Sequence, residues 1–423
     1  MKPIARPDRE IHGDGVSRLC CGDAAATLAR WHSAHDGVQM AYMDPPFMSG
    51  GAYQFRQRIG VEGWRGHREL VRSRIAYIDR WPGGPEQYLS MMEQAVALTR
   101  ELLREDGCLF LHVDWRSAGD LRVMLDRVFG RRAFVNEIIW AYESGGRTTT
   151  HFSRKHDTIF LYRKGKSFFF DPSAIGTARG PQRRNHMRRG VDDDGRVYYA
   201  INSGEREYRY YEDEPVYPGD VWTDISHLQQ RDPERTGFET QKPVALLQRM
   251  LLATTREDDW VCDPFAGSGT TAAAAASLGR RVLTADASPL SVHQTRRRLA
   301  AAGSGFTVEL DGMPSDTDAE LSAQSSPTDG GLRVMLHSFR VPGGERYSTP
   351  SLLPWEDTLV DYWSAGRLLD GEYTVHSFDM RSVSHPALDG SLTIAHGPGV
   401  PAVHIVCALG GEYWYEAERY TGE

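Results

Sequence analysis

Two short segments, far apart in the chain, hold residue types that could do chemistry together. They are 44–47 (Asp-Pro-Pro-Phe) and 263–271 (Asp-Pro-Phe-Ala-Gly-Ser-Gly-Thr-Thr). The first follows an apolar run, 38–43, which predicts a short buried strand. Its two prolines remove backbone donors and fix φ, so we expect a stiff loop presenting a carboxylate, free carbonyls and a ring. Ligands bind at such strand ends in open α/β sheets, although Asp-Pro is also common in surface turns.

The second segment lies between an apolar run and a helical stretch. Gly267 and Gly269 would let the backbone turn sharply and approach a ligand, and the following helix start offers backbone donors. Asp286 ends the next predicted strand, where it could accept hydrogen bonds from ribose hydroxyls. No lysine follows Gly269, which excludes a P-loop. A glycine pair alone is weak evidence, but acids on both sides favour a nucleoside site over a structural turn.

Together the two segments resemble the amino-methyltransferases of DNA. These enzymes transfer a methyl group from S-adenosylmethionine to the exocyclic amine of adenine or cytosine. Gln241-Lys242-Pro243 resembles a further motif of that family, and Gly22-Asp23 does so more weakly. Here 44–47 precedes 263–271, which resembles the order of the permuted β group. The resemblance covers about residues 10–310.

The resemblance assigns the 44–47 segment to catalysis. Asp44 and the Pro45 carbonyl would accept hydrogen bonds from the target amine, Pro46 belongs to the same motif, and Phe47 would stack on the base. An aromatic amine is a poor nucleophile because its lone pair is delocalised, and two acceptors help it to pyramidalise and attack. The base must first be flipped from the duplex. The family more often has Tyr at the fourth position, and Phe47 keeps only the stacking.

The resemblance also implies the cofactor, S-adenosylmethionine, and no metal. Asp263 would lie near the methionine end and Asp286 near the ribose, and the remaining predicted contacts are Phe265, Gly267, Gly269, Thr270 and Lys242. Asp rather than Ser at position 44 favours adenine-N6 over cytosine-N4 as the target, as a tendency of the family. A nicotinamide-dependent dehydrogenase ranks lower because it leaves 44–47 unexplained. Intact Asp44, Gly267 and Gly269 argue against a non-catalytic DNA-binding protein.

The elements that must position these segments alternate between strands and helices. We expect an α/β fold, with a Rossmann-like, seven-stranded mixed sheet of the methyltransferase type, an inserted target-recognition region and a small β-rich C-terminal appendix. The predicted boundaries are 1–163 for the catalytic half, 164–235 for the insertion, 236–312 for the cofactor half, 313–331 for a linker and 332–423 for the appendix. Residues 47–81 show no clean period and predict an active-site loop or flap.

The inserted region is basic, then acidic, and rich in tyrosine. Its arginines suit phosphates and guanine edges, although a solvated loop with self-neutralising charges is an equal alternative. The tyrosines could stack on bases or form the core of a small β module. The predicted DNA-binding residues are Arg179, Arg183, Arg184, Arg188 and Arg189.

Composition limits the remaining possibilities. A net charge of −8 argues against a protein that coats nucleic acid indiscriminately. No apolar run approaches the roughly 20 residues that span a bilayer, and no secretory signal is visible, so we expect a cytoplasmic protein. Double-stranded DNA is the expected partner, with a homodimer and a cognate restriction or phage-defence component as further possibilities. For His112, Asp114 and His156, structural hydrogen bonding is favoured over catalysis.

Overall fold

A mixed sheet runs through the whole molecule in the computed structural model, which describes residues 1–58, 71–143, 148–178, 186–341, 360–382, 385, 388–408 and 410–417. Its centre is a block of parallel strands in the spatial order β18-β3-β17-β16-β4-β7. Their bounds are Phe306–Glu309, Ser17–Cys21, Arg281–Asp286, Trp260–Asp263, Val38–Met43 and Leu103–Val113, in that order. All of β4 is buried, as expected of a parallel strand covered on both faces.

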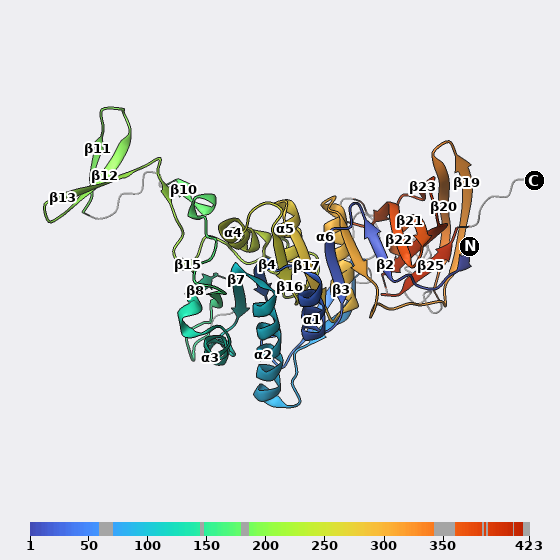
Figure 1. Cartoon of the computed structure of the whole chain (residues 1–423), viewed down its shortest axis with the longest axis horizontal. Helices are drawn as coiled ribbons and strands as arrows, with labels where there is room; N and C mark the ends of the chain where they lie inside the picture. Colours follow the sequence, from blue (N-terminus) through green and yellow to red (C-terminus); the bar gives the residue numbers. More distant parts are fainter. Residues whose placement is uncertain are drawn as a thin grey trace, which may run out of the picture.

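Helices cover both faces of this block, so the centre of the molecule has three layers (Figure 1). One face carries α1 (Ala24–Ala34), α2 (Gly84–Leu102) and α3 (Ala118–Phe129). The other carries α4 (Val244–Thr254), α5 (Thr270–Ser277) and α6 (Pro289–Ala301). Asp23 begins α1 as a side-chain cap, because its carboxylate accepts a hydrogen bond from the Ala26 amide at 3.0 Å. None of the helices in the described residues is long and apolar enough to cross a membrane.

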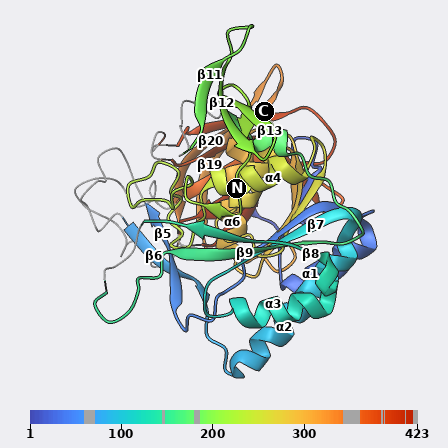
Figure 2. The same cartoon turned by 90° about the vertical axis from the view of Figure 1, so that its left-hand side faces the viewer.

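Beyond β7 the sheet becomes antiparallel and then gives rise to an arm. β9 (His156–Arg163) pairs antiparallel with both β7 and β8 (Phe134–Ala141), and β15 (Val221–Trp222) forms the edge. The arm is a separate three-stranded sheet of β11 (Arg188–Val191), β12 (Val197–Ser203) and β13 (Arg206–Tyr211). The arm projects from the body in both views, whereas β15, near the end of the predicted insertion, stays in the main sheet (Figures 1 and 2).

At the other end the sheet continues into the C-terminal part of the chain. Beyond β18 the order is β2-β22-β21-β24-β25-β1, which makes fifteen strands in all. Their bounds are Arg9–His12, Glu372–Met380, Val360–Leu369, Val400–Cys407, Glu412–Glu416 and Lys2–Pro3. The predicted number of strands in this sheet, seven, is therefore wrong. β2 pairs with the edge of β18 that faces away from β3, and β22 pairs with β2, so the C-terminal strands extend the same sheet.

Two further predictions are corrected. The predicted linker 313–331 contains β19 (Glu320–Thr328), which forms a second sheet with β20 (Gly331–Arg340) and β23 (Ser391–Ala395). This sheet shares a hydrophobic core with β21, β24 and β25. The small polar residues of β19 therefore form a strand because of tertiary packing rather than local propensity.

The predicted loop 47–81 contains the β5–β6 hairpin, Ala52–Arg58 paired with Val71–Ile78. The rings of Tyr53 and Tyr77 stack across the pair at 4.9 Å, and Phe55 packs on Phe238 at 4.8 Å. These cross-strand and long-range contacts stabilise a segment whose charged sequence obscures its period.

Candidate active site

The two segments singled out in the sequence meet at one edge of the sheet. β4 and β16 are parallel neighbours, with Met40 opposite Val261 and Ala41 opposite Cys262, so their carboxyl ends lie side by side. A cavity of about 240 Å³ opens there. Ten of the predicted residues line it: Asp44, Pro45, Pro46, Phe47, Lys242, Asp263, Phe265, Gly267, Thr270 and Asp286.

The glycine turn shapes one end of this cavity. Gly267 has a φ of 51°, and its amide donates to Asp286 Oδ2 at 2.8 Å. A Cβ at Gly267 would find its nearest neighbour, the Phe265 carbonyl oxygen, 3.9 Å away, so this backbone faces free space. Gly269 differs, because a Cβ there would lie 2.6 Å from Thr295 Oγ1. Gly269 is thus required for close packing against α6 and does not line the cavity.

Two buried carboxyl groups lie beside the turn. Burial raises the pKa of Asp263 to about 7, although hydrogen bonds from the Thr271 side chain and the Phe265 amide oppose this. Burial also raises the pKa of Asp286, and the amides of Ser288 and Gly267 partly offset it. Asp286 accepts one backbone hydrogen bond on each oxygen, from Ser288 at 2.8 Å and from Gly267 at 2.8 Å. Because a carboxylate has about four acceptor sites, Asp286 can still accept hydrogen bonds from a ligand.

Lys242 is directed at the catalytic segment rather than only at the predicted cofactor end. Its Nζ donates to Asp44 Oδ1 at 2.7 Å and to Oδ2 at 2.6 Å, and lies 5.0 Å from the centre of the Phe47 ring. Its carbonyl accepts a hydrogen bond from Thr270 Oγ1 at 3.1 Å. Lys242 thus joins the two predicted sets, because its main chain holds the start of α5 and its ammonium holds Asp44. The charge pair is a long-range contact that the sequence did not reveal.

Phe47 rests on a buried hydrogen-bonded network. The imidazole of His112 lies 6.0 Å from the Phe47 ring at an interplanar angle of 29°. Nδ1 of His112 is hydrogen-bonded to Tyr42 Oη at 2.8 Å, and Nε2 is hydrogen-bonded to Asp157 Oδ2 at 3.1 Å. These contacts agree with the structural role predicted for His112. Both ring nitrogens of His112 therefore have hydrogen-bond partners inside the network.

The β5–β6 hairpin and the residues that follow it supply an outer wall of the cavity, where the sequence predicted an active-site loop or flap without its two strands. Tyr53, Tyr77 and Trp81 line the cavity together with the residues of the glycine turn. Asp79 fixes the loop that follows Phe47, since its carboxylate accepts hydrogen bonds from the Ser49 amide at 2.7 Å and from Trp81 Nε1 at 3.0 Å. The signal available in the sequence was the unusual density of aromatic residues in 47–81.

The two predicted DNA-binding arginines that the structure describes, Arg188 and Arg189, do not line the cavity. Arg188 and Arg189 lie in β11 of the arm, with Nη2 of Arg188 2.8 Å from Glu207 Oε2 and Nε of Arg189 3.9 Å from Glu212 Oε1. Arg179, Arg183 and Arg184 lie outside the described residues. In the described part, each arm arginine of the predicted set therefore has an acidic neighbour in the arm.

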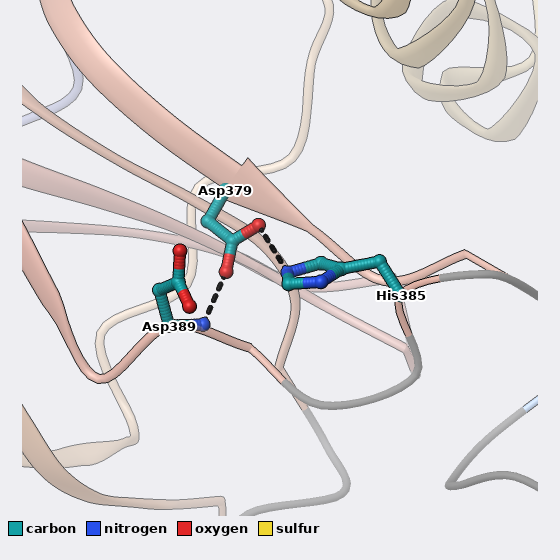
Figure 3. Close-up of side chains that lie close together, drawn as sticks. All are labelled: Asp379, His385 and Asp389. Carbon is teal, nitrogen blue, oxygen red and sulfur yellow. Dashed lines mark hydrogen bonds and ion pairs between the residues drawn. The ribbon is translucent and has the colours of Figure 1, made fainter.

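One group of side chains in the described residues has the composition of a cation site. It consists of Asp379, His385 and Asp389, which lie in the C-terminal part and do not line the cavity (Figure 3). Asp379 Oδ1 is 2.9 Å from His385 Nε2, and Asp379 Oδ2 accepts from the Asp389 amide. These internal hydrogen bonds account for the cluster, and nothing at the cavity depends on it.

Comparison with known proteins agrees with this geometry. A family model described as DNA methylase matches residues 38–296. The chain is 24% identical over 309 residues to the type II methyltransferase M.EcaI of Enterobacter cloacae, covering 62% of this chain and 65% of that protein. It is 24% identical over 327 residues to the DNA adenine methyltransferase YhdJ of Escherichia coli, covering 77% of this chain and 96% of that one. The chain thus spans just under two thirds of M.EcaI.

A solved structure of a putative DNA modification methylase from Thermus thermophilus, complexed with S-adenosyl-L-methionine, has a TM-score of 0.41 and 20% identity. The likeness covers 70% of this chain and 99% of that one. The family match spans more than half of the sequence, from β4 through the glycine turn into α6. The chain therefore belongs to the DNA methylase family, the amino-methyltransferases that modify adenine-N6 or cytosine-N4.

Proposed function

We propose that this protein transfers a methyl group from S-adenosylmethionine to the N6 amine of adenine in double-stranded DNA. The observation that carries the proposal is the shared cavity. The Asp44–Phe47 segment and the glycine turn with Asp286 line the same space, from two strands that are sequence-distant but adjacent in the sheet. A base held at one end and a nucleoside held at the other would meet inside it.

The cofactor end of the cavity fits S-adenosylmethionine. The open space over Gly267 admits a ligand against the backbone, and Asp286 keeps acceptors for ribose hydroxyls. Asp263 brings a carboxyl group whose pKa is raised to about 7 by burial, so a cationic group nearby would favour its ionised form. When bound, the cofactor supplies an electrophilic methyl group on a sulfonium.

The target end of the cavity fits an exocyclic amine. Asp44 and Pro45 both line it, and a carboxylate and a backbone carbonyl are the acceptors that an aromatic amine needs in order to pyramidalise. The Asp44 carboxylate is engaged by Lys242, so an incoming amine has to share or replace that contact. Phe47 offers a face for the flipped base, and stacking of this kind returns about 1–3 kcal/mol per base.

We propose adenine rather than cytosine as the target base for two reasons. Residue 44 is Asp, which in this family accompanies adenine more often than cytosine, and the E. coli relative that aligns over most of its length is named an adenine methyltransferase. The cytosine-N4 amine remains the second candidate, because the same pair of acceptors would serve it. The arm, with Arg188 and Arg189, is proposed to contact the duplex around the target.

The test is direct chemical analysis of modified DNA. Purified protein is incubated with S-adenosylmethionine and genomic DNA. The DNA is then digested to nucleosides, which are separated and identified by mass spectrometry. N6-methyldeoxyadenosine is expected, whereas N4-methyldeoxycytidine would move the proposal to its alternative. If the protein bound NAD in calorimetry and not S-adenosylmethionine, the proposal would fail.

A matched variant connects the activity to the cavity. Asp44→Ala should abolish transfer while leaving cofactor affinity within about twofold, because Asp44 acts on the amine and not on the cofactor. Undiminished transfer by Asp44→Ala would refute the role given to this carboxylate.

A further inference from the structure

Two large aromatic side chains are exposed beside the active site and take no part in the cavity. Trp115 is 47% exposed and Phe152 is 98% exposed. Neither lines the cavity. An almost fully exposed phenylalanine is costly to hydrate, and exposed apolar groups that gather at one place mark binding sites.

The sheet brings both residues to the edge that carries Asp44. β7 runs parallel to β4, with Leu111 opposite Met43, so Trp115 follows the same edge of the sheet as Asp44. β9 runs antiparallel to β7, with Thr158 opposite Val113, so the residues just before β9 return to that edge. Phe152 is among them.

A guanidinium group completes the cluster. Arg154 places its Cζ 3.7 Å from the centre of the Trp115 ring, and Arg116 places its own at 4.9 Å. Arg116 is also paired with Asp114 through its side chain and its amide, the latter at 2.9 Å from Oδ1. Arg154 is exposed. An arginine stacked on an exposed indole presents a π face and a positive charge together, which is the combination that binds bases and phosphates.

The position of the cluster points to the ligand. In the order β4-β7-β9-β8-β15, the cluster lies at the carboxyl end of β7 and the start of β9, beside Asp44, which follows the neighbouring strand β4. On the inner side, His112 of β7 stacks on Phe47 at 6.0 Å. DNA whose target base enters the cavity would therefore have Trp115, Phe152 and Arg154 beside it, one strand along the same edge from Asp44.

We propose that Trp115, Phe152 and Arg154 form a DNA-contacting platform that binds the duplex beside the flipped base. The aromatic faces stack on bases that the flip exposes, and Arg154 contacts a neighbouring phosphate. The inference deepens the proposed function and rests on it. The platform binds DNA and takes no part in the transfer itself.

The experiment uses full-length protein with Trp115→Ala, Phe152→Ala and Arg154→Ala made singly. DNA affinity is measured by fluorescence anisotropy with a labelled fragment of the genomic DNA used in the activity test, in the presence of S-adenosylmethionine. Each aromatic variant should weaken DNA binding about 5- to 150-fold, which is the loss of about 1–3 kcal/mol for one stacked base. KM for DNA should rise in parallel, whereas kcat at saturating DNA and the calorimetric Kd for S-adenosylmethionine should not change.

Leu369→Ala is the matched control, because Leu369 is also 47% exposed but lies in β21 at the other end of the sheet. Unchanged DNA affinity in Trp115→Ala and Phe152→Ala would overturn the platform, as would an equal loss in Leu369→Ala or a fall in kcat at unchanged KM. The proposed function fails separately, if the wild-type protein modifies no DNA, because anisotropy reports binding without turnover.

Discussion

The molecule has two charge-rich regions that differ in their exposure to water. In the arm, Arg196 contacts Asp213 at 2.7 Å, and the exposed fractions of their side chains are 42% and 59%. Between α6 and the C-terminal strands, Arg296 contacts Glu10 at 3.1 Å and Glu412 at 3.0 Å, with exposed fractions of 0%, 0% and 1%. The first pair can exchange its partner for water or phosphate at little cost. The second cannot, because buried charges are stable only when paired.

The buried charges connect the C-terminal strands to the active site through α6. Arg296 lies on one side of this helix, together with His293, which is 2.8 Å from Asp361 of β21. The other side carries Thr295, against Gly269, and Arg298, which donates to the Ser268 carbonyl at 3.2 Å. The C-terminal strands therefore hold the helix on which the glycine turn packs. Buried ion pairs thus position the cavity, and exposed ones stay accessible to DNA.

The largest effect is expected from breaking the buried pair. Arg296→Met removes the guanidinium that pairs with Glu10 and Glu412 and leaves His404 as their shared partner, which should lower the free energy of unfolding by about 3–5 kcal/mol. Arg196→Met in the arm is the control, and it should leave the urea midpoint unchanged. Equal urea midpoints for the two variants would contradict the distinction between buried ion pairs that position the cavity and exposed ion pairs in the arm.

A pH dependence of stability should follow from the same network. Although burial alone would raise it, Arg296 and His404 hold the pKa of Glu412 at about 2, below its ordinary 4.5. This contribution is present above pH 4.5 and is lost as the pH falls towards 2. Glu10 and Glu412 raise the pKa of His404 above 6.5 against the effect of burial. That contribution is present below pH 6.5 and is lost as the pH rises through the raised value.

Thermal unfolding across pH therefore should show a maximum between about 4.5 and 6.5 from this network. Glu412→Gln should be less stable there and should lose less on acidification than the wild-type protein. If the stability of Glu412→Gln fell with decreasing pH as steeply as that of the wild type, other carboxylates would account for most of the acid dependence.

The smallest effect on the fold, with a selective effect on DNA, is expected from the arm. The double variant Arg188→Ala/Arg189→Ala should bind DNA more weakly, and the slope of log affinity against log salt should become shallower by about one for each phosphate that is no longer neutralised. Its unfolding curve should match that of the wild type. If the salt slope did not change, the arm arginines would be paired with their own acids when DNA is bound.

Much of the local structure was predictable because local patterns specify it. The apolar run 38–43 is β4 to the residue. The β5–β6 hairpin and β19 were missed because each is held by contacts with residues far along the chain, such as Phe238 for Phe55. Propensity carries little information about such strands.

Residue types alone indicated the family and the two segments that share the cavity, because Asp-Pro-Pro-Phe and the paired glycines are constrained by chemistry at short range. The partners of these segments depend on the packing of the whole chain. It set Lys242 on Asp44, placed Thr295 against Gly269, and joined Glu10, Arg296 and Glu412 in one buried network. These partners are separated by long stretches of chain, and only the order of strands in the sheet brings them together.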